Sequence, residues 1–130
     1  MKQNLPKNER LSGLINIEKL FTEGNSFIVY PLRVVFRFCE LTSESPVQIL
    51  AGVSKKRFKK ATDRNKIKRQ IKEAYRQNKE TIVNFFTTKN ECVLIAFFYV
   101  ADVLPEKKII EDKMKIALTR ITEKSTEKTN

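Results

Sequence analysis

Apolar side chains recur at helical spacing near both ends of the chain. A first helix is predicted over residues 14 to 23, where the apolar positions and a glycine stop are Leu14, Ile17, Phe21 and Gly24. Pro105 marks the start of a last helix whose apolar stripe consists of Ile110, Met114, Ala117, Leu118 and Ile121. The polar residues 123 to 130 predict a frayed tail, which leaves an ordered core over about residues 9 to 122.

Three segments carry strand patterns. A β-branched, apolar run after Pro31 predicts a strand over residues 32 to 40, and the polar residues 42 to 45 predict a turn. Apolar and other residues then alternate over residues 47 to 53, which is typical of a strand with two different faces. The continuous apolar run of residues 92 to 100 predicts a strand that is covered on both faces.

The segment between the second and third strands is strongly basic. Residues 55 to 79 hold twelve of the 26 Lys and Arg residues and two acidic residues, so this segment has a net charge of +10. The remaining residues have fourteen basic and thirteen acidic side chains, so the net charge of +11 comes almost entirely from one segment. Such a concentration of charge favours a polyanionic partner, since docking releases the partner's condensed counterions.

A helix is predicted within this basic segment, starting at Arg64 with Asp63 as its N-cap. One arc of its surface is suited to packing and holds Ile67, Ile71, Ala74 and Tyr75. The opposite arc is mainly cationic and holds Asn65, Lys68, Arg69, Lys72, Arg76 and Lys79. Like charges four residues apart destabilise an isolated helix, which indicates that a bound polyanion relieves the repulsion.

The composition limits which kinds of functional site the chain can contain. A chain of 130 residues is long enough for one domain, and it has no apolar stretch as long as a membrane helix. The N-terminal residues lack a secretory apolar segment, so a cytoplasmic location is expected. Cys39 and Cys92 are expected to be separate, buried, reduced thiols, and no metal site is expected on the protein. The chain has no histidine and no carboxylate pair at a catalytic spacing, so no catalytic residue is predicted on it.

Two ordinary explanations compete with polyanion binding. A basic helix is most often a solvated surface, but the segregation of charge onto one arc argues against that interpretation. Membrane attachment requires bulky inserting side chains, whereas the apolar arc here is better sized for packing on a sheet.

The basic segment and its surroundings resemble the protein subunit of bacterial ribonuclease P. The resemblance rests on the string VSKKRFKKATDRNKIKRQIKEAYR, whose characteristic residues are Ser54, Lys55, Lys56, Arg64, Asn65, Lys66, Lys68 and Arg69. Arg10 and Leu11, followed by the helix with Phe21 and Gly24, also match the family pattern. Lys66 replaces the usual arginine, the loop 57–63 is one residue longer and lacks a glycine, and Ile17 stands where a phenylalanine is common.

The resemblance implies an α/β (α+β) sandwich with a mixed sheet of about four strands, three helices and a left-handed β-α-β crossover. It also implies an RNA-binding subunit of an endonuclease and hydrolase, in which the catalytic RNA, assisted by Mg²⁺ bound mainly by RNA, removes the 5′ leader of precursor tRNA. The residues expected to bind the catalytic RNA are Lys55, Lys56, Arg57, Lys59, Lys60, Arg64, Asn65, Lys66, Lys68, Arg69, Lys72 and Arg76. Those expected to bind the leader are Ile17, Phe21 and Phe36.

Other functions remain open at this level. A ribosomal or RNA-chaperone module would bind structured RNA without supporting tRNA cleavage. A DNA reader is disfavoured because the sequence has no paired recognition helices and no dimerisation heptads. A stand-alone nuclease would cleave precursor tRNA without an RNA cofactor.

Overall fold

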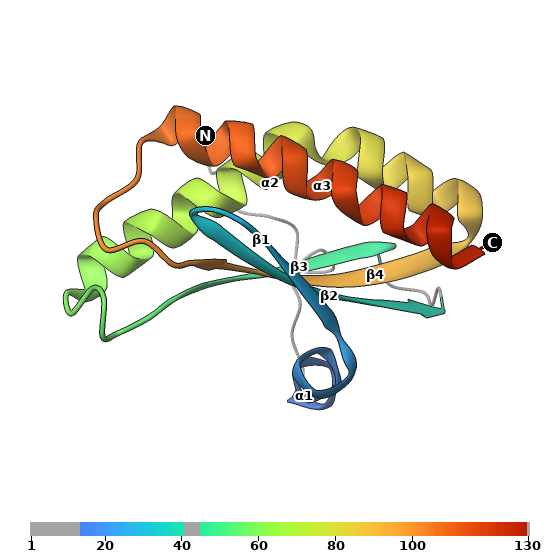
Figure 1. The fold of residues 1–130 in the computed structure, drawn as a ribbon, viewed down its shortest axis with the longest axis horizontal. Coiled ribbons are helices and arrows are strands. Elements are labelled where there is room, and N and C mark those ends of the chain that lie inside the picture. The colour runs from blue at the N-terminus through green and yellow to red at the C-terminus, as the bar shows by residue number, and fades with distance from the viewer. Residues whose placement is uncertain (1–13, 41–44, 130) are drawn as a thin grey trace.

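The chain folds into three layers, with one helix on one face of a four-stranded sheet and two helices on the other (Figure 1). The computed structural model describes residues 14–40 and 45–129. The elements in chain order are α1 (Leu14–Glu23), β1 (Asn25–Val29), β2 (Leu32–Glu40), β3 (Val47–Val53), α2 (Ala61–Lys89), β4 (Glu91–Tyr99) and α3 (Lys107–Thr129). The predicted mixed α+β sheet with three helices is confirmed. Arg10, Leu11 and most of the expected turn at 42–45 lie outside the described residues.

The sheet has the strand order β1-β2-β4-β3, and it is mixed because β3 runs parallel to β4 while the other neighbours are antiparallel. Helix α2 connects β3 to β4, as expected for a β-α-β crossover, and the left-handed sense of this crossover stays a prediction. The sequence patterns did not reveal β1. This edge strand leaves most of its residues exposed, so it lacks the apolar run that marks a buried strand.

Each face of the sheet has its own apolar cluster. On the first face, α2 and α3 cover a large cluster that includes Val34, Ile95 and Phe97. On the other face, α1 contributes Leu20 to a small cluster, which it forms with Val35, Leu94 and Ala96. Side chains alternate between faces along a strand, so neighbouring residues of β2 and β4 belong to different clusters.

The predicted bounds of α1, β2 and β3 agree with the structure, but the predicted start of α2 was wrong. The helix begins at Ala61 with Lys60 as its N-cap, three residues before Arg64. Asp63 therefore lies in the first turn, where its negative charge interacts favourably with the partial positive charge of the helix N-terminus. An acidic residue near a helix start is consistent with both the N-cap and the first turn, so the sequence alone did not distinguish between these two positions.

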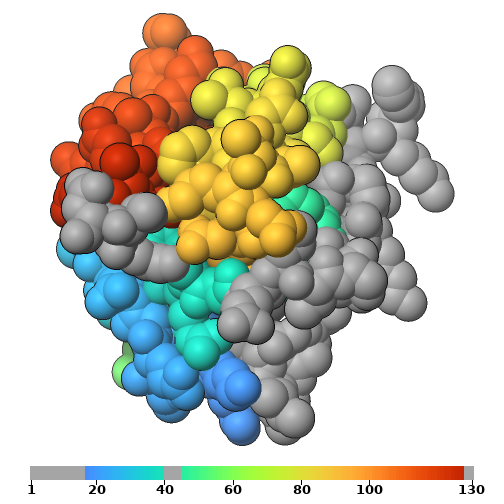
Figure 2. Space-filling model, turned by 90° about the vertical axis from the view of Figure 1, so that its right-hand side faces the viewer, coloured from blue at the N-terminus to red at the C-terminus, as the bar shows by residue number. Residues whose placement is uncertain are grey.

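The predicted frayed tail was also wrong, since α3 continues to Thr129. Its last turns pack beside the end of α2 (Figure 2). Ser125 is completely buried there, and its hydroxyl accepts a hydrogen bond of 2.8 Å from Lys89 Nζ. Lys89 is 3.6 Å from Glu91, so this small polar network fastens the C-terminal end of α3 to the α2–β4 junction. These polar residues can be part of the packed structure because they form hydrogen bonds and ion pairs with one another.

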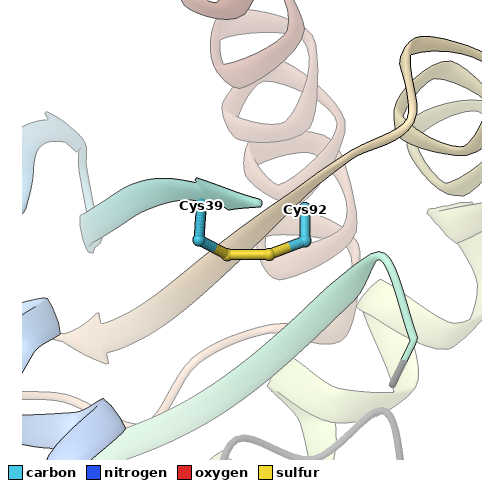
Figure 3. The surroundings of a disulfide bond; sticks show 2 residues. All are labelled: Cys39 and Cys92. Carbon is cyan, nitrogen blue, oxygen red and sulfur yellow. A yellow bond between two sulfur atoms is a disulfide. The ribbon is translucent and has the colours of Figure 1, made fainter. Parts of the chain in front are cut away.

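Cys39 and Cys92 form a disulfide, and the expectation of two separate reduced thiols was therefore wrong (Figure 3). The β2–β4 register places the two cysteines directly opposite one another, with their Cα atoms 5.1 Å apart. Residues that are 53 positions apart in the chain thus become neighbours through strand pairing, which a list of cysteine spacings does not reveal. Within residues 14–40 and 45–129, no helix is long and apolar enough to cross a membrane.

Candidate RNA-binding surface

Five basic residues of α2 lie on one arc of that helix. Its buried residues face the sheet, and its side toward α3 lines a groove with Gln70, Glu73 and Gln77. At 100° per residue, the cationic arc extends from the flank away from α3, where Lys68, Lys72 and Lys79 lie, to the outer side of the helix, where Arg69 and Arg76 also line this groove. The cationic residues of this arc are Lys68, Arg69, Lys72, Arg76 and Lys79. Together with Asn65, these residues form the surface that we call the cationic flank.

Two of the predicted RNA-binding cations have acidic partners. Arg76 forms an ion pair with Glu73 one turn earlier on α2, and Arg57 Nη1 lies 2.7 Å from Asp102 Oδ1. For the other nine basic residues, the structure records no carboxylate partner within the described parts of the chain; these are Lys55, Lys56, Lys59, Lys60, Arg64, Lys66, Lys68, Arg69 and Lys72. Most of the positive charge is therefore available to an external anion.

The loop between β3 and α2, residues 54–60, is held by the side chain of Arg64 and by the buried ring of Phe58. Arg64 Nη1 donates hydrogen bonds of 2.8 Å to the carbonyl oxygens of Phe58 and Lys59. Phe58 is 7% exposed, and its ring centroid lies 6.0 Å from that of Tyr99. The lysines of this loop are exposed around this anchor. Arg64 thus orders the loop as well as adding charge, a role that the sequence did not reveal.

A second surface lies on the face of the sheet that carries α1. Phe21 on α1 is 48% exposed, and its ring centroid lies 5.7 Å from that of Phe98 on β4. A Cβ at Gly52 would lie 2.6 Å from the Phe98 ring, so the glycine makes room for this ring beside β3. Ile17 packs at the edge of the small apolar cluster beneath α1. We call Phe21 and Phe98 the aromatic platform.

Phe36 does not belong to this platform, which corrects the expectation that it binds the leader. Its side chain is 1% exposed and lies in the cluster on the opposite face of the sheet, between Phe27 and Phe38. The sequence reasoning missed Phe98 instead. It lies in a run of nine apolar residues, where neither alternation nor polarity distinguishes the two faces, so only the register identifies it.

The two surfaces adjoin at the ends of β3 and β4. The parallel register pairs Gly52 with Phe98 and Val53 with Tyr99, and the cationic loop begins at the next residue, Ser54. Arg37 on β2 pairs with Glu23 at the end of α1 at 3.0 Å and so helps to hold α1 over this face of the sheet. One polyanion could therefore contact the cationic loop while a neighbouring single strand lies on the aromatic platform.

The chain is similar to known proteins over most of its length. The family model described as "Ribonuclease P" matches residues 5–122. The chain belongs to the ribonuclease P protein family. The ribonuclease P protein component of Porphyromonas gingivalis is 40% identical over 117 residues, which cover 90% of this chain and 85% of that protein. The component of Chlorobaculum tepidum is 34% identical over 110 residues, which cover 78% of this chain and 71% of that protein.

Solved ribonuclease P proteins share the fold. The Staphylococcus aureus protein matches with a TM-score of 0.63 at 19% identity, covering 87% of this chain and 94% of that one. The Thermotoga maritima protein matches with a TM-score of 0.53 at 27% identity, covering 92% and 93%. The chain is thus a protein component of ribonuclease P, an endoribonuclease.

Proposed function

We propose that the cationic flank and the loop 54–60 bind the phosphate backbone of the catalytic RNA. The observation that carries this proposal is the group of nine basic side chains on α2 and its approach loop for which the described parts of the chain hold no acidic partner. Lys and Arg at such positions contact phosphates and position the protein, with little dependence on base sequence. The bonds from Arg64 to the loop carbonyls lower the entropy lost on binding, because the loop is already ordered.

We further propose that the aromatic platform binds the single-stranded 5′ leader of precursor tRNA. Phe21 and Phe98 present ring surfaces that can stack on any unpaired base, each stack contributing about 1 to 3 kcal/mol. Stacking does not depend on base identity, which suits leaders that differ among tRNA precursors. Ile17 supplies an apolar wall beside the rings, whereas Phe36 is excluded by its burial.

In this proposal the catalytic groups belong to the RNA. The side chains of the cationic flank and loop are chiefly ammonium and guanidinium groups, which repel Mg²⁺ and cannot ligate it, so the surface does not fit a protein-held metal site. The protein's residues would bind and orient the RNAs, and Mg²⁺ held by the catalytic RNA would supply the positive charge that assists hydrolysis of one phosphodiester, whose product is a tRNA with a 5′ phosphate. Because the proposed substrate is precursor tRNA, we propose a cytoplasmic location for the protein.

Reconstitution tests the proposal. The chain is mixed with its cognate ribonuclease P RNA at a low Mg²⁺ concentration, and cleavage of a precursor tRNA is followed by product length and 5′ end chemistry. The protein should raise the cleavage rate and should have no activity without the RNA. RNA binding without faster cleavage would favour an RNA-chaperone module, and cleavage by the protein alone would indicate a stand-alone nuclease.

A further inference from the structure

The disulfide lies on the same face of the sheet as α1. Cys39 packs at the edge of the small cluster that contains Leu20, Val35 and Leu94, and Cys92 lies opposite it on β4 (Figure 3). The bond therefore ties β2 to the beginning of β4 at Cys92, two residues after the C-cap Asn90 of α2. The loop that it closes contains β3, the cationic loop and the whole of α2.

The sheet does not depend on this bond for its pairing. Strands β2 and β4 are paired from Leu32–Tyr99 to Glu40–Glu91, and the large apolar cluster lies on the opposite face. Cys39 is partly exposed, whereas Cys92 is 7% exposed. An exposed sulfur is the one that an external thiol or disulfide can reach, so exchange should begin at Cys39.

We propose that Cys39 and Cys92 form a reversible redox site whose co-reactant is a small-molecule disulfide such as oxidised glutathione. The Cys39 thiolate attacks the glutathione disulfide, forming a mixed disulfide and releasing one glutathione. The Cys92 thiolate then displaces the second glutathione. Two electrons pass from the protein thiols to the glutathione disulfide, and their two protons end on the two glutathione thiols.

The reversibility rests on the proposed function, because an RNA-processing protein works in a reducing compartment. Protein disulfides in such compartments are usually transient or redox-sensing. Oxidation restricts the unfolded chain through the long loop that it closes, and it stiffens the part of the sheet next to α1. The redox state of the surroundings therefore changes the rigidity of the part of the sheet on which α1 packs.

A redox titration of the full chain tests this site. The protein is equilibrated at a series of ratios of reduced to oxidised glutathione, quenched with acid and alkylated, and its modified thiols are counted by intact mass. The protein should pass from two alkylated thiols to none as the proportion of oxidised glutathione rises, and reduced glutathione should reverse the change. A bond that persists at every ratio, or thiols that never join, would overturn the proposal.

Single variants test the order of attack. Cys92→Ala should form a mixed disulfide with glutathione about tenfold faster than Cys39→Ala, because only Cys39 is accessible. Equal rates would overturn this order. The oxidised wild type should melt roughly 10 °C above the Cys39→Ala/Cys92→Ala double variant, whose melting temperature should not respond to the redox buffer. None of these measurements involves RNA, so their failure would leave the cleavage test of the proposed function unaffected.

Discussion

Phe21 on α1 and Phe98 on β4 form a tilted ring pair with centroids 5.7 Å apart, next to the point where the cationic loop begins. The pair joins a helix from the start of the chain to a strand near its end. It places exposed aromatic surface beside the loop 54–60, which is proposed to bind the catalytic RNA. This adjacency explains how a small domain could contact an RNA enzyme and its single-stranded substrate at the same time.

Removing either ring should weaken binding of precursor tRNA. Phe21→Ala and Phe98→Ala should each lower the affinity of the reconstituted holoenzyme by about 5- to 150-fold, because each removes one base stack. Affinities are measured by equilibrium titration with precursor tRNA and with mature tRNA, which lacks the leader. Tyr30→Ala is the matched control, since Tyr30 is 63% exposed but lies outside the platform. Equal losses for precursor and mature tRNA would contradict a leader site.

A side chain at Gly52 should displace the Phe98 ring of the aromatic platform. In Gly52→Ala the new Cβ would lie 2.6 Å from the Phe98 ring, so the ring has to move. Overpacking of this kind lowers the free energy of unfolding by about 1 to 3 kcal/mol. The loss is at the low end of this range where the displaced ring can move toward solvent. Leader affinity should fall, and adding Phe98→Leu should restore the free energy of urea unfolding but not the affinity. Full leader affinity in the single variant would show that the ring position is unimportant.

Charge reversal on the cationic flank should affect the catalytic RNA. Lys68→Glu/Lys72→Glu should greatly weaken RNA binding and lower the slope of log affinity against log salt by about two, because two phosphate contacts are lost. Filter binding over a salt series measures both quantities. Lys113→Glu/Lys115→Glu carries the same change in charge on α3 and should retain binding. If the α2 variant bound RNA as well as wild type, the flank would be ordinary solvated surface.

Phe36 should contribute to stability and not to leader recognition. Phe36→Ala removes a fully buried ring and should lower the free energy of unfolding by about 3 to 5 kcal/mol. The milder Phe36→Leu should remain folded, and its affinity for precursor tRNA should match wild type. Urea unfolding and substrate titration on the same preparation separate the two effects. A leader-specific loss in Phe36→Leu would place this residue in the binding site after all.

Stability should decline in alkaline solution partly through Tyr99. Burial, and to a lesser degree the nearby Tyr30, raises the pKa of Tyr99 above its usual value of 10.0. Its hydroxyl donates a 2.6 Å hydrogen bond to the Val103 carbonyl oxygen, which requires the protonated form. The folded state therefore holds this proton more tightly, so the contribution is complete below about pH 10 and is lost as the pH rises through the raised pKa. Urea unfolding between pH 8 and 12 should show a smaller decline for Tyr99→Phe than for Tyr30→Phe.

Much of the fold and of the cationic surface could be predicted because the signals are local. Helical spacing predicts α1, alternation predicts β3, and the helical periodicity of the basic segment separates its apolar and cationic arcs. Such features depend on residues within one or two turns or a few strand positions. The start of α2 and the length of α3 were mispredicted for a related reason, since caps and tails depend on partners elsewhere, such as Lys89 for Ser125.

The sequence by itself therefore determined the order of the elements other than β1, the concentration of positive charge and the family to which the chain is similar. Tertiary structure decided which aromatic rings face outward and which cysteines meet. Phe36 and Phe98 look alike in apolar strands, and only the register of β2, β4 and β3 turns one into the core and the other onto the platform. The same register brings Cys39 opposite Cys92. The reason is that strand pairing joins distant residues, and a shift of one position would exchange the two faces of a strand.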